Sequence, residues 1–286
     1  NQTRTRLSTY ELETLESIQS FKQPEDGAFS DMANTVYRPL DKVGDAAFDT
    51  EVGQYVASAV GEVVELISDS ATWSVRREAL LEKFRDDGFD VASVEDISEL
   101  DFREVDQRSS LVEEKYKAIA AAEGFVVGTT GAAGLVADIP LLLGIAFRAA
   151  AETAFRYGFD PSDEQERAYL LDLVSTASSP TEEIRTEALS HLEERTREMA
   201  GTPGYREAET VLTIQFVEAL AESITVRLSK GKLGQAVPLM GGFIGGGFNM
   251  WFVGQVVDMA RMMYRERFLM REHGDTIEAL VGQPQA

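Results

Sequence analysis

Three polar side chains lie inside sequence that is otherwise apolar, and they are the first candidates for chemistry. Glu123 and Asp138 belong to the glycine-rich segment 121–148, and Asn249 belongs to the charge-free run 236–257. Carboxylates in apolar surroundings can act as general acids or bases, or can bind the polar group of an apolar ligand. Glu123 and Asp138 are about four turns apart on a continuous helix, so we do not expect them to form a catalytic pair.

Other reactive groups are scarce. The chain has no cysteine, which excludes disulfides, thiolate metal sites and cysteine nucleophiles. Its two histidines, His191 and His273, are far apart in the sequence, and we expect both on helix surfaces rather than as ligands. No zinc-site spacing, phosphate loop or nucleophile elbow is present, so we expect no catalytic residue, no metal and no cofactor. The least favoured hypothesis is an enzyme using four residues in an apolar cavity: Glu123, Asp138, Tyr157 and Asn249.

The sequence predicts helices along nearly the whole chain, because apolar residues recur three or four positions apart. No alternation of apolar and polar residues indicates a strand. We expect an all-α fold, a multi-helix bundle built around two glycine-rich apolar helical hairpin segments. Residues 1–30 are expected to form a loosely attached arm, residues 31–275 a single helical domain and residues 276–286 a tail. Asp160, followed by Pro161, is typical of a helix N-cap.

The two glycine-rich segments share one plan. In each, glycines three or four residues apart lead to a polar residue four positions later, which places them in one stripe on a helix. Glycine costs about 1 kcal/mol relative to alanine inside a helix, so a repeated stripe indicates close approach of another backbone. We therefore expect the two segments to pack glycine face to glycine face. The stripes contain the following residues: Gly124, Gly128, Gly131, Gly134 and Asp138 in the first, and Gly241, Gly245 and Asn249 in the second.

Cations bracket both apolar segments. Ten of the 27 lysines and arginines lie just before or after them, a distribution that favours contact with anionic lipid headgroups. The simpler alternative is that a buried helix needs solvated ends, and that arginine near a helix C-terminus complements the helix dipole. The ten are Lys115, Lys117, Arg148, Arg156, Arg227, Lys230, Lys232, Arg261, Arg265 and Arg267.

Length alone does not place these segments relative to a membrane. A span needs about 20 apolar residues, and both segments reach that length only by including Asp138 or Asn249. A buried helical pair ranks first, an interfacial or re-entrant element second and a true span last. Asp138 has its own alternatives, because it can cap a helix that starts at Ile139-Pro140 or contact a ligand directly.

The excess of acidic over basic residues limits the kinds of molecule that the protein can bind. The net charge is −22, and arginine outnumbers lysine 20 to 7, which excludes nucleic acid as a general partner. Acidity of this kind favours adaptation to high salt over an ordinary acidic cytosolic protein. The first fifteen residues contain no apolar signal region, so we expect a cytoplasmic protein, peripheral on the inner membrane face if it binds lipid.

Three blocks of the sequence carry motifs of one protein family: Glu123, Gly124, Asp138 and Pro140 in the first, Tyr157, Gly158 and Asp160 with Glu166 and Arg167 following in the second, and Pro238, Gly241, Gly245 and Asn249 in the third. In these motifs the chain resembles the EcsC family. The resemblance covers about residues 37 to 270, and it implies a helical protein in the cytoplasm or at the inner membrane face, with no settled reaction. The family takes its name from an operon that also encodes an ABC transporter.

Two functions follow as expectations. The favoured one is non-enzymatic binding of lipid or another apolar ligand, with a membrane surface as a further partner. The alternative is a structural or adaptor protein that binds a transporter or another protein and uses its glycines only to pack its core. The candidate ligand residues are Glu123, Gly128, Gly131, Asp138, Arg148, Tyr157, Gly241, Gly245, Asn249 and Tyr264. The candidate headgroup cations are Lys115, Lys117, Lys230, Lys232, Arg261, Arg265 and Arg267.

Overall fold

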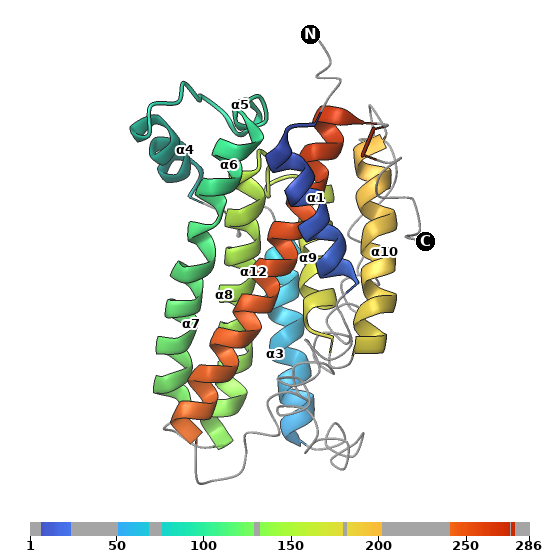
Figure 1. Cartoon of the computed structure of the whole chain (residues 1–286). Coiled ribbons are helices and arrows are strands. Elements are labelled where there is room, and N and C mark those ends of the chain that lie inside the picture. The colour runs from blue at the N-terminus through green and yellow to red at the C-terminus, as the bar shows by residue number, and fades with distance from the viewer. Residues whose placement is uncertain are drawn as a thin grey trace.

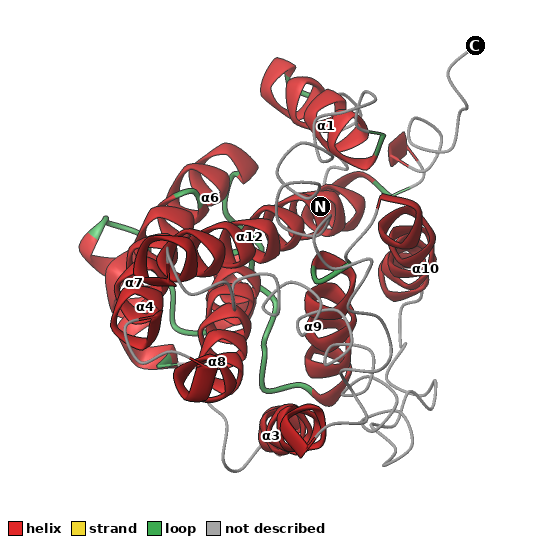
Figure 2. Ribbon diagram, turned by 90° about the horizontal axis from the view of Figure 1, so that it is seen from below, coloured by secondary structure: helices red, strands yellow, loops and turns green. Residues whose placement is uncertain are grey.

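The computed structural model describes seven stretches of the chain: residues 7–23, 51–68, 76–128, 132–179, 182–201, 241–274 and 276–277. Every regular element bounded in these stretches is an α-helix, and none of their residues lies in a strand, which confirms the predicted all-α fold (Figures 1 and 2). The helices are α1 (Thr9–Lys22), α3 (Glu51–Ser68), α4 (Arg77–Asp86), α5 (Val94–Ile97), α6 (Phe102–Ser109), α7 (Leu111–Gly128), α8 (Ala132–Arg156), α9 (Glu164–Ala177), α10 (Glu182–Gly201) and α12 (Gly241–His273).

The bundle is organised around α12. This helix has 33 residues, so it is about 50 Å long. Figure 1 shows it running obliquely through the bundle, and Figure 2 shows it between α7 and α8 on one side and α9 and α10 on the other. It packs against all four of these helices and against α1 and α6. Its residues 263–270 are all buried, and eight consecutive residues cover every side of a helix, as expected of a helix enclosed by neighbours.

The first glycine-rich segment forms a helical hairpin. α7 ends at Gly128 and α8 begins at Ala132, and the two helices pack against each other and against α12. The second segment is described from Gly241 onward, as the first part of α12. No helix in the described stretches is both long enough and apolar enough to cross a bilayer.

The N-terminal arm is more firmly attached than expected. α1 crosses α12 in Figure 1 and packs against it. Ile18 is fully buried and Leu15 is 5% exposed, because the helix turns its apolar side toward the core. Lys22 Nζ also lies 2.7 Å from Glu266 Oε1 on α12. The prediction of a loosely attached arm over residues 1–30 is therefore wrong for α1.

Two expected helix starts differ from the structure. α9 begins at Glu164, because Asp160 accepts hydrogen bonds from the backbone N and the hydroxyl of Ser162, at 2.9 and 2.7 Å, and so forms a turn instead of a cap. α8 runs through Asp138 and Pro140 without restarting, so Asp138 is not an N-cap.

Two glycines in left-handed conformations offer a test of the turns that join these helices. Gly158, between α8 and α9, has a φ of 77°, and a Cβ there would lie 2.9 Å from the backbone N of Ser98. Gly88 has a φ of 94°, but a Cβ there would meet nothing within 4 Å. Both alanine variants incur the left-handed penalty of about 1 kcal/mol, and Gly158→Ala must also displace Ser98. We expect Gly158→Ala to lower the free energy of unfolding in urea by at least about 1 kcal/mol more than Gly88→Ala. Equal losses would show that the Ser98 contact does not constrain this turn.

Candidate functional site

A fully buried carboxylate, Asp106 on α6, receives four donors from three other parts of the chain. Arg265 on α12 donates Nε to Oδ1 at 2.6 Å and Nη2 to Oδ2 at 2.7 Å, which is a bidentate pair. The hydroxyls of Tyr10 on α1 and Tyr157, just after α8, each donate to the same carboxylate at 2.5 Å. Arg261 Nη2 lies 3.5 Å away. This one side chain therefore fixes α1, α6, α12 and the end of α8 relative to one another.

The pKa values of this cluster agree with a charged pair. Burial alone would raise the pKa of Asp106, but the hydrogen bonds and charge of Arg265, with the two tyrosines, hold it at about 2. Burial and the hydrogen bond to Asp106 raise the pKa of Tyr10 to about 12. The tyrosines are therefore neutral donors and Asp106 is an anion, so the cluster stores no proton for general acid or base catalysis near neutral pH.

A second buried pair is formed by the arginine two residues further along α12. Arg267 donates Nη1 to Oε1 and Nη2 to Oε2 of Glu166 on α9, at 2.7 and 2.8 Å, and Tyr264 also donates to this carboxylate. The Arg267 guanidinium lies 4.1 Å from the ring centroid of Phe159 and 4.5 Å from that of Tyr169. These distances place the cation between aromatic faces, which replace part of its lost hydration.

A third carboxylate, Glu152 on α8, joins α7 to the same end of the bundle. It accepts from Lys115 Nζ at 2.5 Å, from the Tyr116 hydroxyl at 3.0 Å and from Arg156 Nη2 at 2.9 Å. Arg156 also donates to the backbone carbonyl of Arg108 at 3.1 Å. Three separate buried carboxylates thus neutralise cations of α7, α8 and α12. We refer to Asp106, Glu152 and Glu166 with these partners as the ionic end of the bundle.

The ionic end corrects part of the predicted headgroup site. Arg265 and Arg267 are only 8% and 5% exposed and are engaged in bidentate pairs, so they cannot meet a lipid headgroup. Tyr157 and Tyr264 are fully buried with their hydroxyls on carboxylates, so they are not ligand contacts either. The structure thus shows that these four side chains hold the fold together.

The remaining described candidates lie along α7, α8 and α12. Lys115 and Arg148 are exposed, Lys117 pairs with Glu113, and Glu123 is half-buried. Asn249 is fully buried on α12. Lys230, Lys232 and Gly131 lie outside the described residues. The helical backbone is described, but not the side-chain surroundings, at Gly128, Asp138, Gly241 and Gly245.

The four residues of the enzyme hypothesis do not all come together. Tyr157 stacks on Tyr264, with ring centroids 6.5 Å apart. Tyr264 and Asn249 are fifteen residues apart on the same helix, which separates them by about 22 Å along its axis. Tyr157 and Asn249 therefore cannot act on one substrate atom.

Sequence reasoning missed two carboxylates of the ionic end, Asp106 and Glu152. Asp106 falls in a stretch rich in acids, where a solvated surface is the ordinary expectation. A signal was present, because Phe102, Val105 and Ser109 mark a buried face at helical spacing and Asp106 lies on that face. Glu152 similarly follows a run of three buried alanines. An acid in phase with a buried stripe is the pattern to look for.

The opposite end of α7, α8 and α12 is poor in charge. Only Glu123 and Asp138 are charged between residues 118 and 147, and no residue is charged in 236–257. Three large apolar side chains are exposed on these helices between this end and the ionic end: Ile119 at 38%, Leu141 at 42% and Met250 at 44%. Each lies nine residues from the glycine-rich end of its own helix, at Gly128, Ala132 and Gly241 respectively. We refer to this region, where the three helix ends lie together in Figure 1, as the apolar end.

Two open pockets lie away from the apolar end. One, of about 650 Å³, lies where α1 and α6 begin, and the other, of about 410 Å³, lies between α9 and α10. Both are lined by mixed polar and apolar residues, and none of the predicted ligand residues lines either of them.

The pairing of Arg265 with Asp106 can be tested against a matched arginine on the surface. Arg265→Met should lower the free energy of unfolding by about 3–5 kcal/mol, because it leaves Asp106 charged and buried. Arg148→Met, which removes an exposed arginine, should change it by less than about 0.5 kcal/mol. Adding Asp106→Leu to Arg265→Met should recover part of the loss. The free energies of unfolding are measured in urea. Similar losses for Arg265→Met and Arg148→Met would contradict the role given to the buried pair.

Comparison with known proteins agrees with the resemblance in the sequence. The model of the EcsC protein family matches residues 13–269, which adds most of α1 to the range expected from the motifs. Protein EcsC of Bacillus subtilis (strain 168) is 29% identical over 180 residues, 63% of this chain and 70% of that protein. The uncharacterized protein YdbA of the same organism is 23% identical over 189 residues, 64% of this chain and 65% of that protein. No solved structure matches the chain. The chain belongs to the EcsC protein family.

Proposed function

We propose that this protein binds lipid at a membrane surface through its apolar end and catalyses no reaction. The observation that carries the proposal is the uneven distribution of charge along the bundle. Buried ion pairs hold one end together, whereas the other end exposes Ile119, Leu141 and Met250 and has few charges. An exposed apolar region on an otherwise highly charged protein is typical of an interaction site.

One exposed cation suits a shallow insertion. Arg148 on α8 lies between the exposed Leu141 and the ionic end, whereas Lys115 on α7 is held at the ionic end by Glu152. Long basic side chains at such positions can extend toward headgroups while their aliphatic parts lie over apolar surface. The aliphatic part of the Lys117 side chain likewise lies against an apolar helix. It contacts α12 at Gly254, where an added Cβ would lie only 2.4 Å from it.

The free energy gained by inserting the three apolar side chains determines how strongly the protein is expected to bind a membrane. A fully buried Leu, Ile or Met side chain contributes about 1.5–3 kcal/mol, and these three are about two-fifths exposed, so each would add about 1 kcal/mol on insertion. The net charge of −22 opposes approach to an anionic surface, and salt screens that repulsion. We therefore propose binding that is reversible, dominated by apolar contact and stronger at high salt.

Vesicle flotation tests the proposal with matched variants. Neutral phosphatidylcholine vesicles and vesicles containing phosphatidylglycerol should both carry the wild-type chain upward in a density gradient. Met250→Glu or Leu141→Glu should reduce the bound fraction about tenfold, because a buried apolar contact is replaced by a charge that must be desolvated. Leu111→Glu is the control, since Leu111 is 63% exposed at the ionic end of α7.

Two outcomes would overturn the proposal: a wild-type chain that stays with the soluble fraction in both vesicle types at high salt, or a control that loses binding as strongly as the apolar-end variants. The first outcome would favour the alternative of an adaptor that meets a protein partner. That alternative stays a prediction from the sequence.

A further inference from the structure

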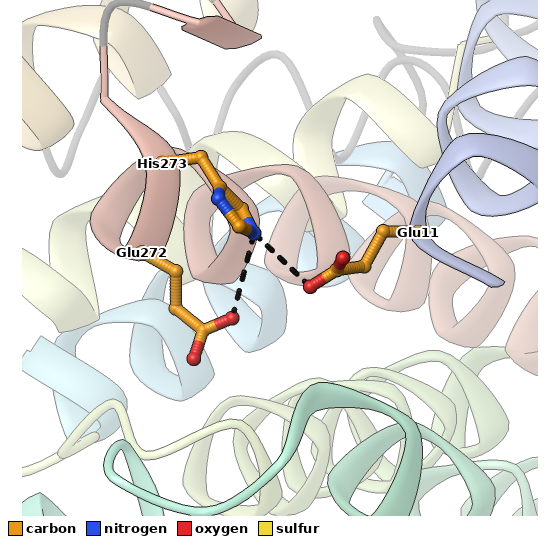
Figure 3. A group of neighbouring side chains, drawn as sticks. All are labelled: Glu11, Glu272 and His273. Atoms are coloured by element: carbon orange, nitrogen blue, oxygen red, sulfur yellow. Dashed lines mark hydrogen bonds and ion pairs between the residues drawn. The ribbon is translucent and has the colours of Figure 1, made fainter. Parts of the chain in front are cut away.

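A histidine and two glutamates converge where α1 begins and α12 ends, at the ionic end of the bundle. Figure 3 shows His273 and Glu272, both at the end of α12, turned toward Glu11 on α1. His273 Nε2 lies 3.0 Å from Glu11 Oε1 and 3.8 Å from Glu272 Oε2. The three potential ligand atoms all lie within 4.8 Å of one another. The proposed lipid site lies at the other end of α12 and uses none of them.

The environment of His273 differs from the one expected from the sequence. The ring is only 6% exposed, so the prediction of a surface position is wrong for His273. Glu11 is also buried, at 4% exposed, and Glu272 is half-buried. The other histidine, His191, is exposed on α10, as expected. A buried imidazole next to two carboxylates is a set of nitrogen and oxygen ligands that suits zinc and similar divalent transition metals.

The spacing of the ligand atoms fits such an ion. Zinc holds nitrogen and oxygen at about 2.0–2.2 Å, so neighbouring ligand atoms of a tetrahedral site lie about 3.4 Å apart. The two distances from His273 Nε2, 3.0 and 3.8 Å, lie on either side of that value. The Glu11–Glu272 separation, at most 4.8 Å, must close by up to about 1.4 Å. A rotation of the half-buried Glu272 side chain can supply this movement.

The surroundings also favour a cation. Glu11 is the third residue of α1 and forms a capping box with Ser8. Its Oε2 accepts from the backbone N of Ser8 at 2.5 Å, which leaves Oε1 turned toward His273. Such a second contact orients a metal-binding carboxylate. His273 is the last residue of α12, where the partial negative charge of the helix C-terminus attracts cations. A divalent ion would balance the charges of the two carboxylates.

We propose that Glu11, Glu272 and His273 bind one divalent transition metal ion of the zinc class. Three protein ligands leave a fourth position for water or an external ligand, as in sites that are not purely structural. The ion would join α1 to the end of α12, so its binding would stabilise the attachment of α1. The three residues lie just outside residues 13–269, which the family model matches.

Titration of the full-length chain, stripped of metal, with Zn²⁺ and Co²⁺ tests this site. One Co²⁺ per chain should bind with the visible absorption of a four-coordinate site, and Zn²⁺ should displace it and raise the melting temperature. His273→Ala and Glu272→Gln should each weaken Zn²⁺ binding at least about tenfold, since even outer-shell partners of a metal ligand are worth 10–100-fold. His191→Ala is the matched control and should bind like the wild type.

Glu272→Gln keeps both the capping box and the Glu11–His273 contact, so it tests the site even if His273→Ala fails to fold. Unchanged Zn²⁺ affinity in Glu272→Gln, or equal losses in Glu272→Gln and His191→Ala, would overturn the proposal. So would Co²⁺ binding with only the weak absorption of a six-coordinate ion, because the acidic surface alone would explain it.

Discussion

The buried pair of Asp106 and Arg265 is the interaction on which the arrangement of the helices depends. A carboxylate with no exposed surface is costly unless its charge is balanced and its oxygens are hydrogen-bonded. Both conditions are met only when α1, α6, α12 and the end of α8 are all in place, because each supplies one part of the cluster. A shift of α12 by one turn would leave two unlike charges buried and apart. The pair therefore fixes the register of the longest helix.

Because the ionic end fixes the position of α12, the apolar end of this helix is not needed to fix its register. The ionic end holds α12 against α6, α8 and α9 through charge and aromatic contacts. α12 also packs on α7 and α8, and its first half is rich in glycine and apolar residues. Small residues allow close packing without specific partners, so this end can expose Leu141 and Met250 at little cost to the fold. The two halves of α12 thus have different functions. The half at the ionic end stabilises the fold, and in our proposal the half at the apolar end contacts lipid.

The sequence predicted the fold class well because helical periodicity is local information. It failed where an outcome depends on residues far apart. Asp106 and Arg265 are 159 positions apart, and nothing near Arg265 shows that its charge is neutralised inside the protein. The same limit made α1 look like a loose arm, since its burial depends on α12. Asp160 failed for a local reason, because a turn with Ser162 competes with a helix cap and the sequence suits both.

Hydrogen–deuterium exchange along α12, with and without phosphatidylcholine vesicles at high salt, tests this division most directly. Amides of residues 258–273 should exchange slowly in both conditions, because the ionic end opens only on global unfolding. Amides of residues 241–257 should exchange faster in the free protein and become protected when vesicles are added. Protection confined to residues 258–273, or no change anywhere along α12, would contradict the division of the helix into a fixed ionic half and a lipid-binding apolar half.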